Sequence, residues 1–307
     1  MSVAIASFQR EASLERLLGS LADALRQPFA AGEARVAEVI VVLDGSTDGS
    51  RDLVERRQEG FPVPLRHLWQ PNRGLAAARN AGIDAANGDL VWLLDDDMTV
   101  DRSAVERHLA HRRHDSPVLM GACTVVTDVP DIARATWWYE ERHRRLATEG
   151  VVTAAKDCSF ANTSAPTELL RAHRFDERFR GYGIEDYELA LRLMEEGVRI
   201  AFALDAAVAH AFSPTRSEML RKLREEGANR VLFRSLHPTH ADIVFRPEPR
   251  RLERMLRTLA PVPGAGAAMW LLARLVDQCA SVTRRPTRRD RLHELADAFA
   301  IHAGVAG

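Results

Sequence analysis

The chain has 307 residues, 46% of them hydrophobic, with 42 lysine and arginine residues against 43 aspartate and glutamate residues. This length and composition permit a sizeable buried core, in one large domain or two ordinary ones. A formal net charge of −1 excludes a global electrostatic field that would attract nucleic acid or an anionic membrane. We therefore expect a soluble globular protein with no nucleic-acid partner, in which any anion binds locally.

The cysteines and the first residues indicate an expected location. Cys123, Cys158 and Cys279 form no C-x-x-C pair and are too sparse for a disulfide framework, which favours buried thiols in a reducing compartment. The apolar run at residues 3–6 is too short for a signal peptide and instead predicts a first strand. The predicted location is therefore the cytoplasm, with the N-terminus retained.

Short apolar runs alternate with helical patterns over the first 130 residues. Strands are predicted at residues 3–6, 38–43, 65–69 and 90–94, and helices at 14–25, near 52, at 76–86 and from 105. Strands and helices alternating at this spacing imply βαβ units and a mostly parallel sheet covered on both faces. This half of the chain has the pattern of a nucleotide-binding α/β layer.

The pattern becomes less regular in the second half of the chain. A strand is predicted at residues 118–126 and a helix at residues 187–194. Prolines and glycines then precede a last helical region that begins at Ala267. We therefore place a soft domain boundary near residue 245.

The last helical region has an apolar face. The residues that share this face are Ala268, Leu272, Leu275, Val276 and Cys279. Arg274 and Asp277 interrupt any continuous apolar span, so the helix is not predicted to cross a membrane. The basic run at residues 284–289 could hold the helix against anionic lipid. We nevertheless expect it to dock on its own domain with a solvated basic face, because such stripes are common; peripheral membrane contact is the alternative.

Three consecutive carboxylates, Asp95, Asp96 and Asp97, follow the apolar run at residues 90–94. Such a cluster costs stability through mutual repulsion unless a cation or a shared proton neutralises it. It falls at the carboxyl end of a predicted buried strand, where open α/β sheets place their ligands. Hard oxygen ligands there suit Mg²⁺ or Mn²⁺. A solvated acidic turn is the competing interpretation.

Two further signals precede this cluster. Asp44 ends the second predicted strand, and its carboxylate can bind a ribose or a base, although the Gly45-Ser46 that follows also fits an ordinary turn. Arg79 lies one turn inside a helix entered at Gly74, whose small residues permit close backbone approach. An alanine-rich packing helix with a surface arginine is the alternative.

Two more signals follow it. Glu185 and Asp186 start a helix, where the positive end of the dipole stabilises a carboxylate, although plain capping gives the same pattern. The glycines at 181 and 183 suggest a site edge that accommodates a ligand. His210 is a single polar residue in an apolar stretch, which taken alone favours a core histidine.

In their order and spacing these motifs resemble family 2 of the GT-A glycosyltransferases over residues 2–235. The matching segments are Ser7-Phe8-Gln9-Arg10, Asp44-Gly-Ser-Thr-Asp-Gly-Ser, the helix from Asn72 to Gly82, Leu94-Asp-Asp-Asp97, Gly183-Ile-Glu-Asp186 and His210. The resemblance implies an α/β GT-A fold with a mostly parallel central sheet. Residues 1–245 would form the catalytic domain, with a nucleotide-binding half at 1–130 and an acceptor-binding half at 131–245. Residues 246–307 would form a helical C-terminal extension.

The resemblance also implies a role for each matching residue. The residues on the donor would be Ser7, Asp44, Arg79, Asp95 and Asp96, with Asp44 on the base or ribose, Arg79 near the base or phosphates, and Asp95 near the ribose. Asp97 would bind the metal and His210 would be a further metal ligand, whereas Asp96 would tolerate change. Asp186 would be the general base and Glu185 its companion. The family commonly has two aspartates before Gly-Ser, and here the first is Leu43.

The implied reaction is transfer of a sugar from a nucleotide-diphosphate-sugar, by default a UDP-sugar, to an acceptor hydroxyl with inversion. Mn²⁺ or Mg²⁺ on Asp97 would neutralise the leaving diphosphate, and Asp186 would take the acceptor proton. The acceptor would be a carbohydrate, a lipid-linked molecule or a natural product. Its specificity would lie in the expected loops 137–150 and 157–165. The aromatic residues at 137–139 could form an acceptor platform or a buried cluster.

Two other functions fit parts of the sequence. The run that ends in Asp95-Asp96-Asp97-Met98-Thr99 also matches the motif of haloacid-dehalogenase-like phosphatases, with Asp95 as nucleophile, Lys156 on the phosphate and Glu185-Asp186 as the metal pair. That motif usually lies on the first strand, however, whereas about 90 residues precede it here. The other alternative is a GT-A fold with a dead site, kept as a nucleotide-binding or interaction module.

Overall fold

The computed structural model describes residues 1–26, 35–111, 115–127, 133–211, 214–245, 251–283 and 286–306, with side chains left out at 133–139, 251 and 286–290. The chain forms two compact units. One comprises Met1–Glu177 with Asp186–Ser213, and the other comprises Arg178–Glu185 with Pro214–Gly307. The sequence signals at residues 137–139 and 284–285 therefore lie outside the described side chains.

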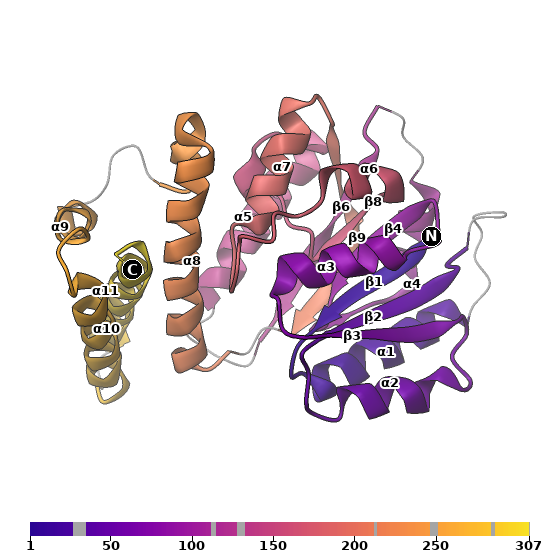
Figure 1. Cartoon of the computed structure of the whole chain (residues 1–307), viewed down its shortest axis with the longest axis horizontal. Helices are drawn as coiled ribbons and strands as arrows, with labels where there is room; N and C mark the ends of the chain where they lie inside the picture. The colour runs from indigo at the N-terminus through magenta and orange to yellow at the C-terminus, as the bar shows by residue number, and fades with distance from the viewer. Residues whose placement is uncertain are drawn as a thin grey trace. The chain divides into compact units, whose positions relative to one another are not determined.

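The first unit contains a nine-stranded sheet in the order β3-β2-β1-β4-β8-β6-β9-β5, with β7 paired to β9 (Figure 1). The strands are β1 Ser2–Ser7, β2 Glu38–Asp44, β3 Leu65–Gln70, β4 Leu90–Asp95, β5 Met98–Thr99, β6 Val118–Val126, β7 Val151–Val152, β8 Asn162–Pro166 and β9 Ile200–Ala211. Strands β1 to β4 pair in parallel, β8 runs antiparallel to β4 and β6, and β6 and β9 are parallel. The predicted α/β class with a mostly parallel sheet is confirmed.

Helices cover both faces of the parallel strands. The helices of this unit are α1 Glu11–Leu25, α2 Ser50–Gln58, α3 Leu75–Ala85, α4 Arg102–Ala110, α5 Ala133–Glu149, α6 Thr167–His173 and most of α7 Glu185–Glu195. Alternate strand residues such as Val3 and Ile5 join the core that contains α1, α2 and α4. Gly82 of α3 lies against Ala4 and Val42 on the opposite face, where a Cβ would come within 3.0 Å of Ala4. Because both faces are covered, β2 is buried along its whole length.

Two segments expected as loops contain regular structure. Residues 137–150 fall largely in α5, whose arginine, glutamate and alanine residues favour a helix. Residues 157–165 begin at the last residue of the short η2 turn, Ala155–Asp157, are irregular at 158–161 and end in β8. The polar side chains of β8 are buried and hydrogen-bonded: Asn162 Oδ1 and Ser164 Oγ lie 2.9 and 2.8 Å from the ring nitrogens of His108. A polar buried strand carries no hydrophobic pattern, so the sequence did not predict it.

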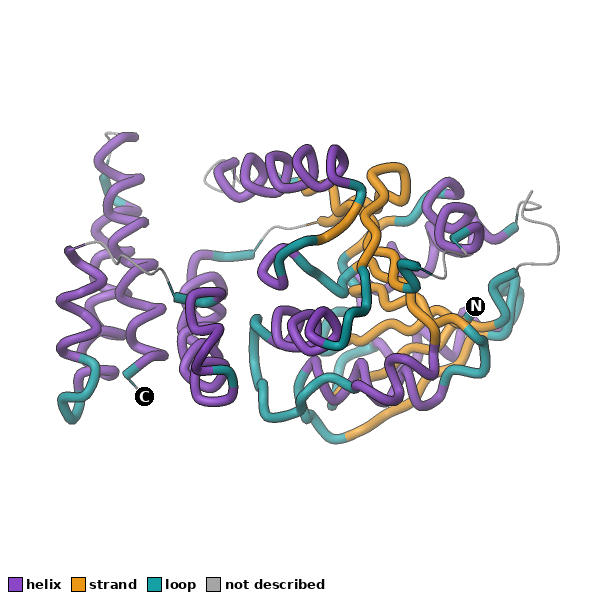
Figure 2. The backbone as a smooth tube through the Cα atoms, turned by 90° about the horizontal axis from the view of Figure 1, so that it is seen from above, coloured by secondary structure: helices purple, strands orange, loops and turns teal. Residues whose placement is uncertain are grey.

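The second unit is helical. Its helices are α8 Arg216–Leu236, η3 Pro238–Ile243, α9 Arg251–Leu259, α10 Ala265–Ser281 and α11 Pro286–Val305 (Figure 2). A Cβ at Gly227 of α8 would overlap the carbonyl of Ile301, and one at Gly304 of α11 would overlap the carbonyl of Arg224. These two glycines therefore allow the backbones of α8 and α11 to approach closely. Within the described ranges, no helix is long and apolar enough to cross a membrane.

Helix α10 docks on its own unit, as expected, but not through the apolar face named from the sequence. Ala273 and Ala280 are buried in the helical unit, and Val276 packs against its core, but Leu272 and Leu275 are 43% and 48% exposed. The helix packs through its other face, where Gly266, Met269, Ala273 and Ala280 are buried, so its leucines are left in solvent. Cys279 is exposed for the same reason, against the expectation of three buried thiols; Cys123 and Cys158 are buried.

The two units divide the chain at other points than the functional domains predicted from the sequence. Helix α8 lies before the predicted boundary near residue 245, yet it groups with the helices after it. The physical reason is its glycine-mediated packing on α11, which is distant in sequence. The assignment of residues 1–130 to the nucleotide, 131–245 to the acceptor and 246–307 to an extension stays a prediction.

Candidate active site

The polar residues at the ends of three parallel strands lie at one edge of the sheet. In the pairing register, Ser7 of β1 faces Leu43 of β2, and Ala6 faces Asp95 of β4. Asp44 is the last residue of β2, and Asp96 and Asp97 form the turn after β4. The structure thus brings together the donor and metal residues that the sequence predicted to share this edge.

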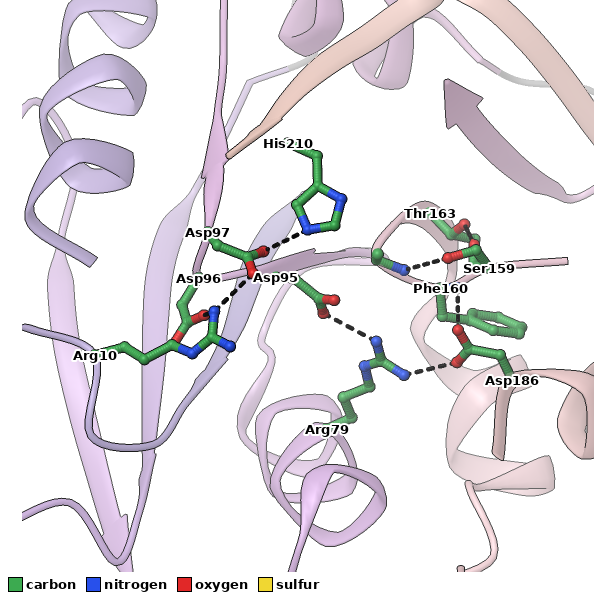
Figure 3. Close-up of polar contacts among 11 residues, drawn as sticks. Arg10, Arg79, Asp95, Asp96, Asp97, Ser159, Phe160, Thr163, Asp186 and His210 are labelled. Atoms are coloured by element: carbon green, nitrogen blue, oxygen red, sulfur yellow. Dashed lines mark hydrogen bonds and ion pairs between the residues drawn. The ribbon is translucent and has the colours of Figure 1, made fainter. Parts of the chain in front are cut away.

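Asp97 lies between a histidine and an arginine (Figure 3). Its Oδ1 is 3.3 Å from Nε2 of His210 on β9, and its Oδ2 accepts a hydrogen bond of 2.6 Å from Nη1 of Arg10. The same Arg10 nitrogen is 3.6 Å from Oδ1 of Asp96. His210 is therefore no isolated core histidine, because it faces the predicted metal ligand.

Arg10 is a site residue for which the sequence indicated no role. It follows Gln9, whose φ of 55° is unusual for a residue with a side chain. Gln9 is held by hydrogen bonds to the turn after β2: its backbone N–H donates to Ser46 Oγ at 3.1 Å, and its Oε1 accepts from the N–H of Asp48 at 3.1 Å. These bonds compensate the backbone strain and fix the loop that presents Arg10.

A second arginine joins two carboxylates on the other side of the site. Nη2 of Arg79 on α3 donates to Asp95 Oδ1 at 2.9 Å, and its Nη1 donates to Asp186 Oδ1 at 2.7 Å. The other oxygen of Asp186 accepts from the backbone N–H of Phe160 at 3.1 Å. The Arg79 guanidinium lies over the ring of Phe175, 5.3 Å from its centroid. Arg79 and Asp186 therefore occupy fixed positions.

Asp44 holds the loop that leads into α3. Its Oδ1 accepts from Gln70 Nε2 at 2.7 Å and from the N–H of Arg73 at 2.9 Å, and its Oδ2 accepts from the N–H of Gly74 at 2.8 Å. Gly74 has a φ of 93°, which favours glycine. In this structure both carboxylate oxygens position the helix that carries Arg79, and a contact with a nucleotide stays a prediction.

The turn before the predicted base is strained. Ile184 has a φ of 82°, which is a clear outlier for a β-branched residue, and it follows Gly183 with the same φ. Asn229 Nδ2 donates to the carbonyl oxygens of this turn, at 2.8 Å for Gly183 and 3.1 Å for Arg180. The buried Glu185 comes next and begins α7, as predicted. The strained turn is thus stabilised by Asn229, which belongs to none of the sequence motifs.

We call Asp95, Asp96, Asp97 and Asp186 the row of carboxylates. Three of them, Asp96, Asp97 and Asp186, have pKa values shifted in different directions. Burial opposes ionisation of Asp97, but the hydrogen bond and charge of His210, together with Arg10, lower its pKa to about 2. Burial raises the pKa of Asp96 to about 7, and although Arg10 opposes this rise, the charge of Asp97 adds to it. Burial also raises the pKa of Asp186 above its ordinary value, against the opposing charge of Arg79.

Two donors for a cation face each other at this edge. They are the carboxylate of Asp97 and the imidazole of His210, and their 3.3 Å separation is close to the ~3 Å between neighbouring octahedral ligands at 2.0–2.1 Å. Among the described residues, no group of three or more histidine, cysteine, aspartate or glutamate side chains could hold an ion. Mg²⁺ and Mn²⁺ commonly bind through one or two carboxylates plus substrate phosphates, so Asp97 fits either ion, and the imidazole of His210 suits the transition metal Mn²⁺ better than Mg²⁺.

A cavity of about 560 Å³ lies beside the same strands. Residues from two strands and α5 line it, among them Cys123, Val125, Glu140, His143, Thr148 and Leu204. Val125 is the register partner of His210. Burial raises the pKa of Cys123 to about 12, and although Arg142 opposes this rise, the charges of Asp95 and Asp97 add to it. The cavity therefore neighbours the strand that carries His210, and none of Asp95, Asp96, Asp97 or Asp186 lines it.

Comparison with known proteins decides the family. The model of glycosyl transferase family 2 matches residues 2–167. The chain belongs to this family. It is 29% identical over 227 residues to validoxylamine A glucosyltransferase of Streptomyces hygroscopicus subsp. limoneus, a match over 64% of this chain and 48% of that protein. It is 34% identical over 189 residues to pre-mycofactocin glycosyltransferase of Mycobacterium tuberculosis strain H37Rv, a match over 57% and 38%. The chain thus spans about half the length, or less, of these curated relatives.

Solved structures show the same fold. A mannosyltransferase from Pyrobaculum calidifontis, in complex with GDP-Man and Mn²⁺, superposes with a TM-score of 0.61 at 19% identity, over 99% of this chain and 85% of that chain. S. aureus TarS 1–349 in complex with UDP-GlcNAc gives 0.54 at 19% identity, over 98% and 90%. These neighbours confirm the predicted GT-A fold. Neither the phosphatase nor the dead module is favoured; Lys156, which would bind phosphate in a phosphatase, is exposed on η2.

Proposed function

We propose that the protein transfers a sugar from a nucleotide-diphosphate-sugar to an acceptor hydroxyl with inversion. The observation that carries the proposal is the row of carboxylates at the sheet edge, which presents Asp97 with His210 at one end and Asp186 at the other (Figure 3). The two ends suit two tasks of one displacement: binding the leaving group and taking the acceptor proton. A single displacement with opposite-side attack inverts the anomeric centre.

Asp97 and His210 are the proposed ligands of Mn²⁺ or Mg²⁺. Their facing donor atoms fit such an ion, and the low pKa of Asp97 keeps its carboxylate ionised. When bound, a divalent cation would neutralise the charge that develops on the diphosphate, which can contribute several kcal/mol. The mannosyltransferase neighbour is in complex with Mn²⁺, which supports this choice. Arg10, the present cation on Asp97, would move aside or bind the same diphosphate.

The donor is proposed to lie along the ends of β1, β2 and β4. Ser7, Asp95 and Asp96 line this edge, and Arg79 holds Asp95 toward the ribose. Trp69, at the end of β3, is 49% exposed and donates its indole N–H to the carbonyl of Ser46 at 3.2 Å. Its ring offers a stacking surface for the base. The structural neighbours are in complex with UDP-GlcNAc and GDP-Man. UDP-sugars and GDP-sugars are therefore the donors to test.

Asp186 is the proposed general base, with Glu185 as its companion. Its carboxylate has about four lone-pair sites, and the bonds from Arg79 and Phe160 fix it while leaving room to accept an acceptor hydroxyl. Burial, which raises its pKa, makes it a stronger base than an ordinary aspartate. As the acceptor oxygen attacks the anomeric carbon, its proton passes to Asp186.

The cavity beside His210 is the proposed acceptor site. It includes Glu140, His143 and Thr148 from the segment predicted to set acceptor specificity. Its volume is that of a small-molecule site, and its mixed lining suits a carbohydrate or a small hydroxylated natural product. Filling it with Thr148→Trp should raise the acceptor KM and leave the affinity for the donor nucleotide unchanged. An unchanged acceptor KM would remove the cavity from the proposal.

The proposal is tested by a thermal-shift panel of nucleoside diphosphates and nucleotide-sugars, each with and without Mn²⁺. One nucleotide should stabilise the protein by several degrees in the presence of Mn²⁺, and the matching nucleotide-sugar should then be hydrolysed slowly or transferred. Stabilisation by no member of the panel would contradict a donor site at this edge. Release of phosphate from a phosphomonoester would instead support the alternative function, a phosphatase.

A further inference from the structure

Helix α10 presents a continuous apolar stripe to solvent. The side chains of this stripe are Ala268, Leu271, Leu272, Leu275, Cys279 and Val282. Leu271 and Leu275 are 59% and 48% exposed, and Val282, just beyond the helix, is 77% exposed. At a rise of 1.5 Å per residue the stripe is about 21 Å long. Single exposed leucines are ordinary, whereas a contiguous row marks an interaction surface.

The stripe is not needed to hold the helical unit together. The opposite face of α10 supplies Met269, Ala273 and Ala280, which are buried among the helices of the unit. The stripe residues therefore lack a role in the core of their own unit, and replacing them should leave its folding intact. Their apolar character calls for a partner outside the helical unit.

The charge around the stripe indicates which partner. Residues 246–307 contain eleven arginines and six acidic residues, a net charge of +5, although the whole chain has a net charge of −1. Arg274 is exposed on the flank of α10, and the sequence after Val282 continues Arg284-Arg285-Pro286-Thr287-Arg288-Arg289. An apolar stripe followed in the sequence by concentrated arginine is the pattern of a segment that lies in a membrane interface.

We propose that this surface docks the protein peripherally on a membrane that contains anionic lipids. The leucines of the stripe enter the boundary between headgroups and acyl chains, while Arg274 on the flank and the net positive charge of residues 246–307 attract the helix to lipid phosphates. A second copy of the chain fits less well, because a two-fold contact would bring together two regions that each carry a net charge of +5. The proposal is independent of the catalytic activity.

The native chain carries its own probe for this docking. Cys279 lies on the stripe and is exposed, whereas Cys123 and Cys158 are buried, so an environment-sensitive fluorophore can be attached selectively to Cys279. With vesicles of phosphatidylcholine and phosphatidylglycerol, its emission should shift to shorter wavelength and at least double in intensity. Pure phosphatidylcholine vesicles, or 0.5 M salt, should abolish most of the change because arginine–lipid attraction is screened.

Vesicle flotation of unlabelled protein tests the stripe itself. The double substitution Leu271→Gln and Leu275→Gln removes apolar surface without changing charge, and should lower partitioning onto the anionic vesicles at least tenfold. The matched control is Ala267→Gln, which adds glutamine at an exposed position on the flank of the same helix, two turns from Arg274. The control should bind as the unchanged protein does.

Three results would overturn the proposal. They are no response of the Cys279 probe to anionic vesicles, binding that the double substitution leaves unchanged, and a probe response that rises with protein concentration without vesicles. The last result would assign the stripe to a second copy of the chain. The labelled native protein gives its answer even if the double variant does not fold, and no donor or acceptor is present in either assay.

Discussion

The site contains two clusters with the same composition, one arginine and two aspartates, but with different surroundings. Arg10 lies in a loop, its side chain is 39% exposed, and it contacts Asp97 and Asp96. Arg79 lies on a helix, its side chain is 4% exposed, and it joins Asp95 to Asp186 above an aromatic ring. An exposed loop cation can leave its carboxylates at low cost, whereas a buried one cannot. We infer that the first cluster exchanges cations and the second fixes geometry.

The largest difference between the two clusters should appear in stability, when each arginine is replaced separately. Arg79→Gln removes a buried cation from two half-buried carboxylates, so it should lower the free energy of unfolding by about 3 kcal/mol. Arg10→Gln removes a more exposed cation, and Asp97 keeps its contact with His210, so the loss should be smaller, about 1 kcal/mol. Urea denaturation of both variants measures the difference. Equal losses would show that the two clusters do not differ as their burial indicates.

The pH dependence of activity should also separate the clusters. Asp186 must be ionised to accept a proton, so kcat/KM should rise with pH through its raised pKa. Arg79 opposes that rise in pKa, and its loss should therefore move the acidic limb of the profile to higher pH. Arg79→Lys keeps the charge and should restore part of the shift. Arg10→Gln should leave the limb in place; a shift in that variant instead would assign the limb to the first cluster.

A substitution of Trp69, at the exposed edge of the site, should change the affinity for the donor. It should not change the cluster of Arg79, Asp95 and Asp186. Base–aromatic stacking contributes about 1–3 kcal/mol per base, so Trp69→Ala should weaken nucleoside-diphosphate binding roughly tenfold. The control is Trp69→Phe, which keeps a stacking face and should lose much less. Isothermal titration in Mn²⁺ measures both variants. A binding constant that Trp69→Ala leaves unchanged would place the base elsewhere.

The smallest effect is expected at Asp96. Burial raises its pKa to about 7, so a neutral side chain of the same shape meets similar surroundings. Asp96→Asn should therefore keep turnover within about threefold, while removing one charge from beside Asp97. Asp97→Asn is the matched comparison, since the same change there removes a proposed metal ligand. Turnover that collapses in both variants would mean that the carboxylates act as one unit.

The strand ends of the site could be predicted because buried parallel strands are apolar throughout and stop at their polar residues. This pattern placed Asp44 and Asp95 at one edge, and the order of motifs added Arg79, Asp186 and His210. Arg10 could not be predicted, since an arginine in a loop has no periodicity and its aim depends on the strained backbone of Gln9. The N–H of Phe160 on Asp186 is a backbone donor, which no side-chain pattern reveals.

Two segments of the fold that the sequence predicted wrongly, β8 and α10, were missed for the same physical reason. Strand β8 is buried through hydrogen bonds of Asn162 and Ser164, and not through apolar side chains. The face of α10 that enters the core carries one large buried side chain, Met269, among glycine and alanine residues, so the leucines on the other side predicted the wrong face. In both places burial follows from backbone fit and polar partners, which hydrophobic periodicity does not register.

The central claim is that Asp97 serves donor binding and Asp186 serves the chemical step. Its most direct test measures, for Asp97→Asn and Asp186→Asn, the Kd for the preferred nucleoside diphosphate with Mn²⁺ and the turnover of the corresponding nucleotide-sugar. We predict that Asp97→Asn loses Mn²⁺-dependent binding. Asp186→Asn should keep Kd within about threefold and lose roughly 10²–10⁴ in turnover. Unchanged turnover in Asp186→Asn, or unchanged Mn²⁺-dependent binding in Asp97→Asn, would contradict the account.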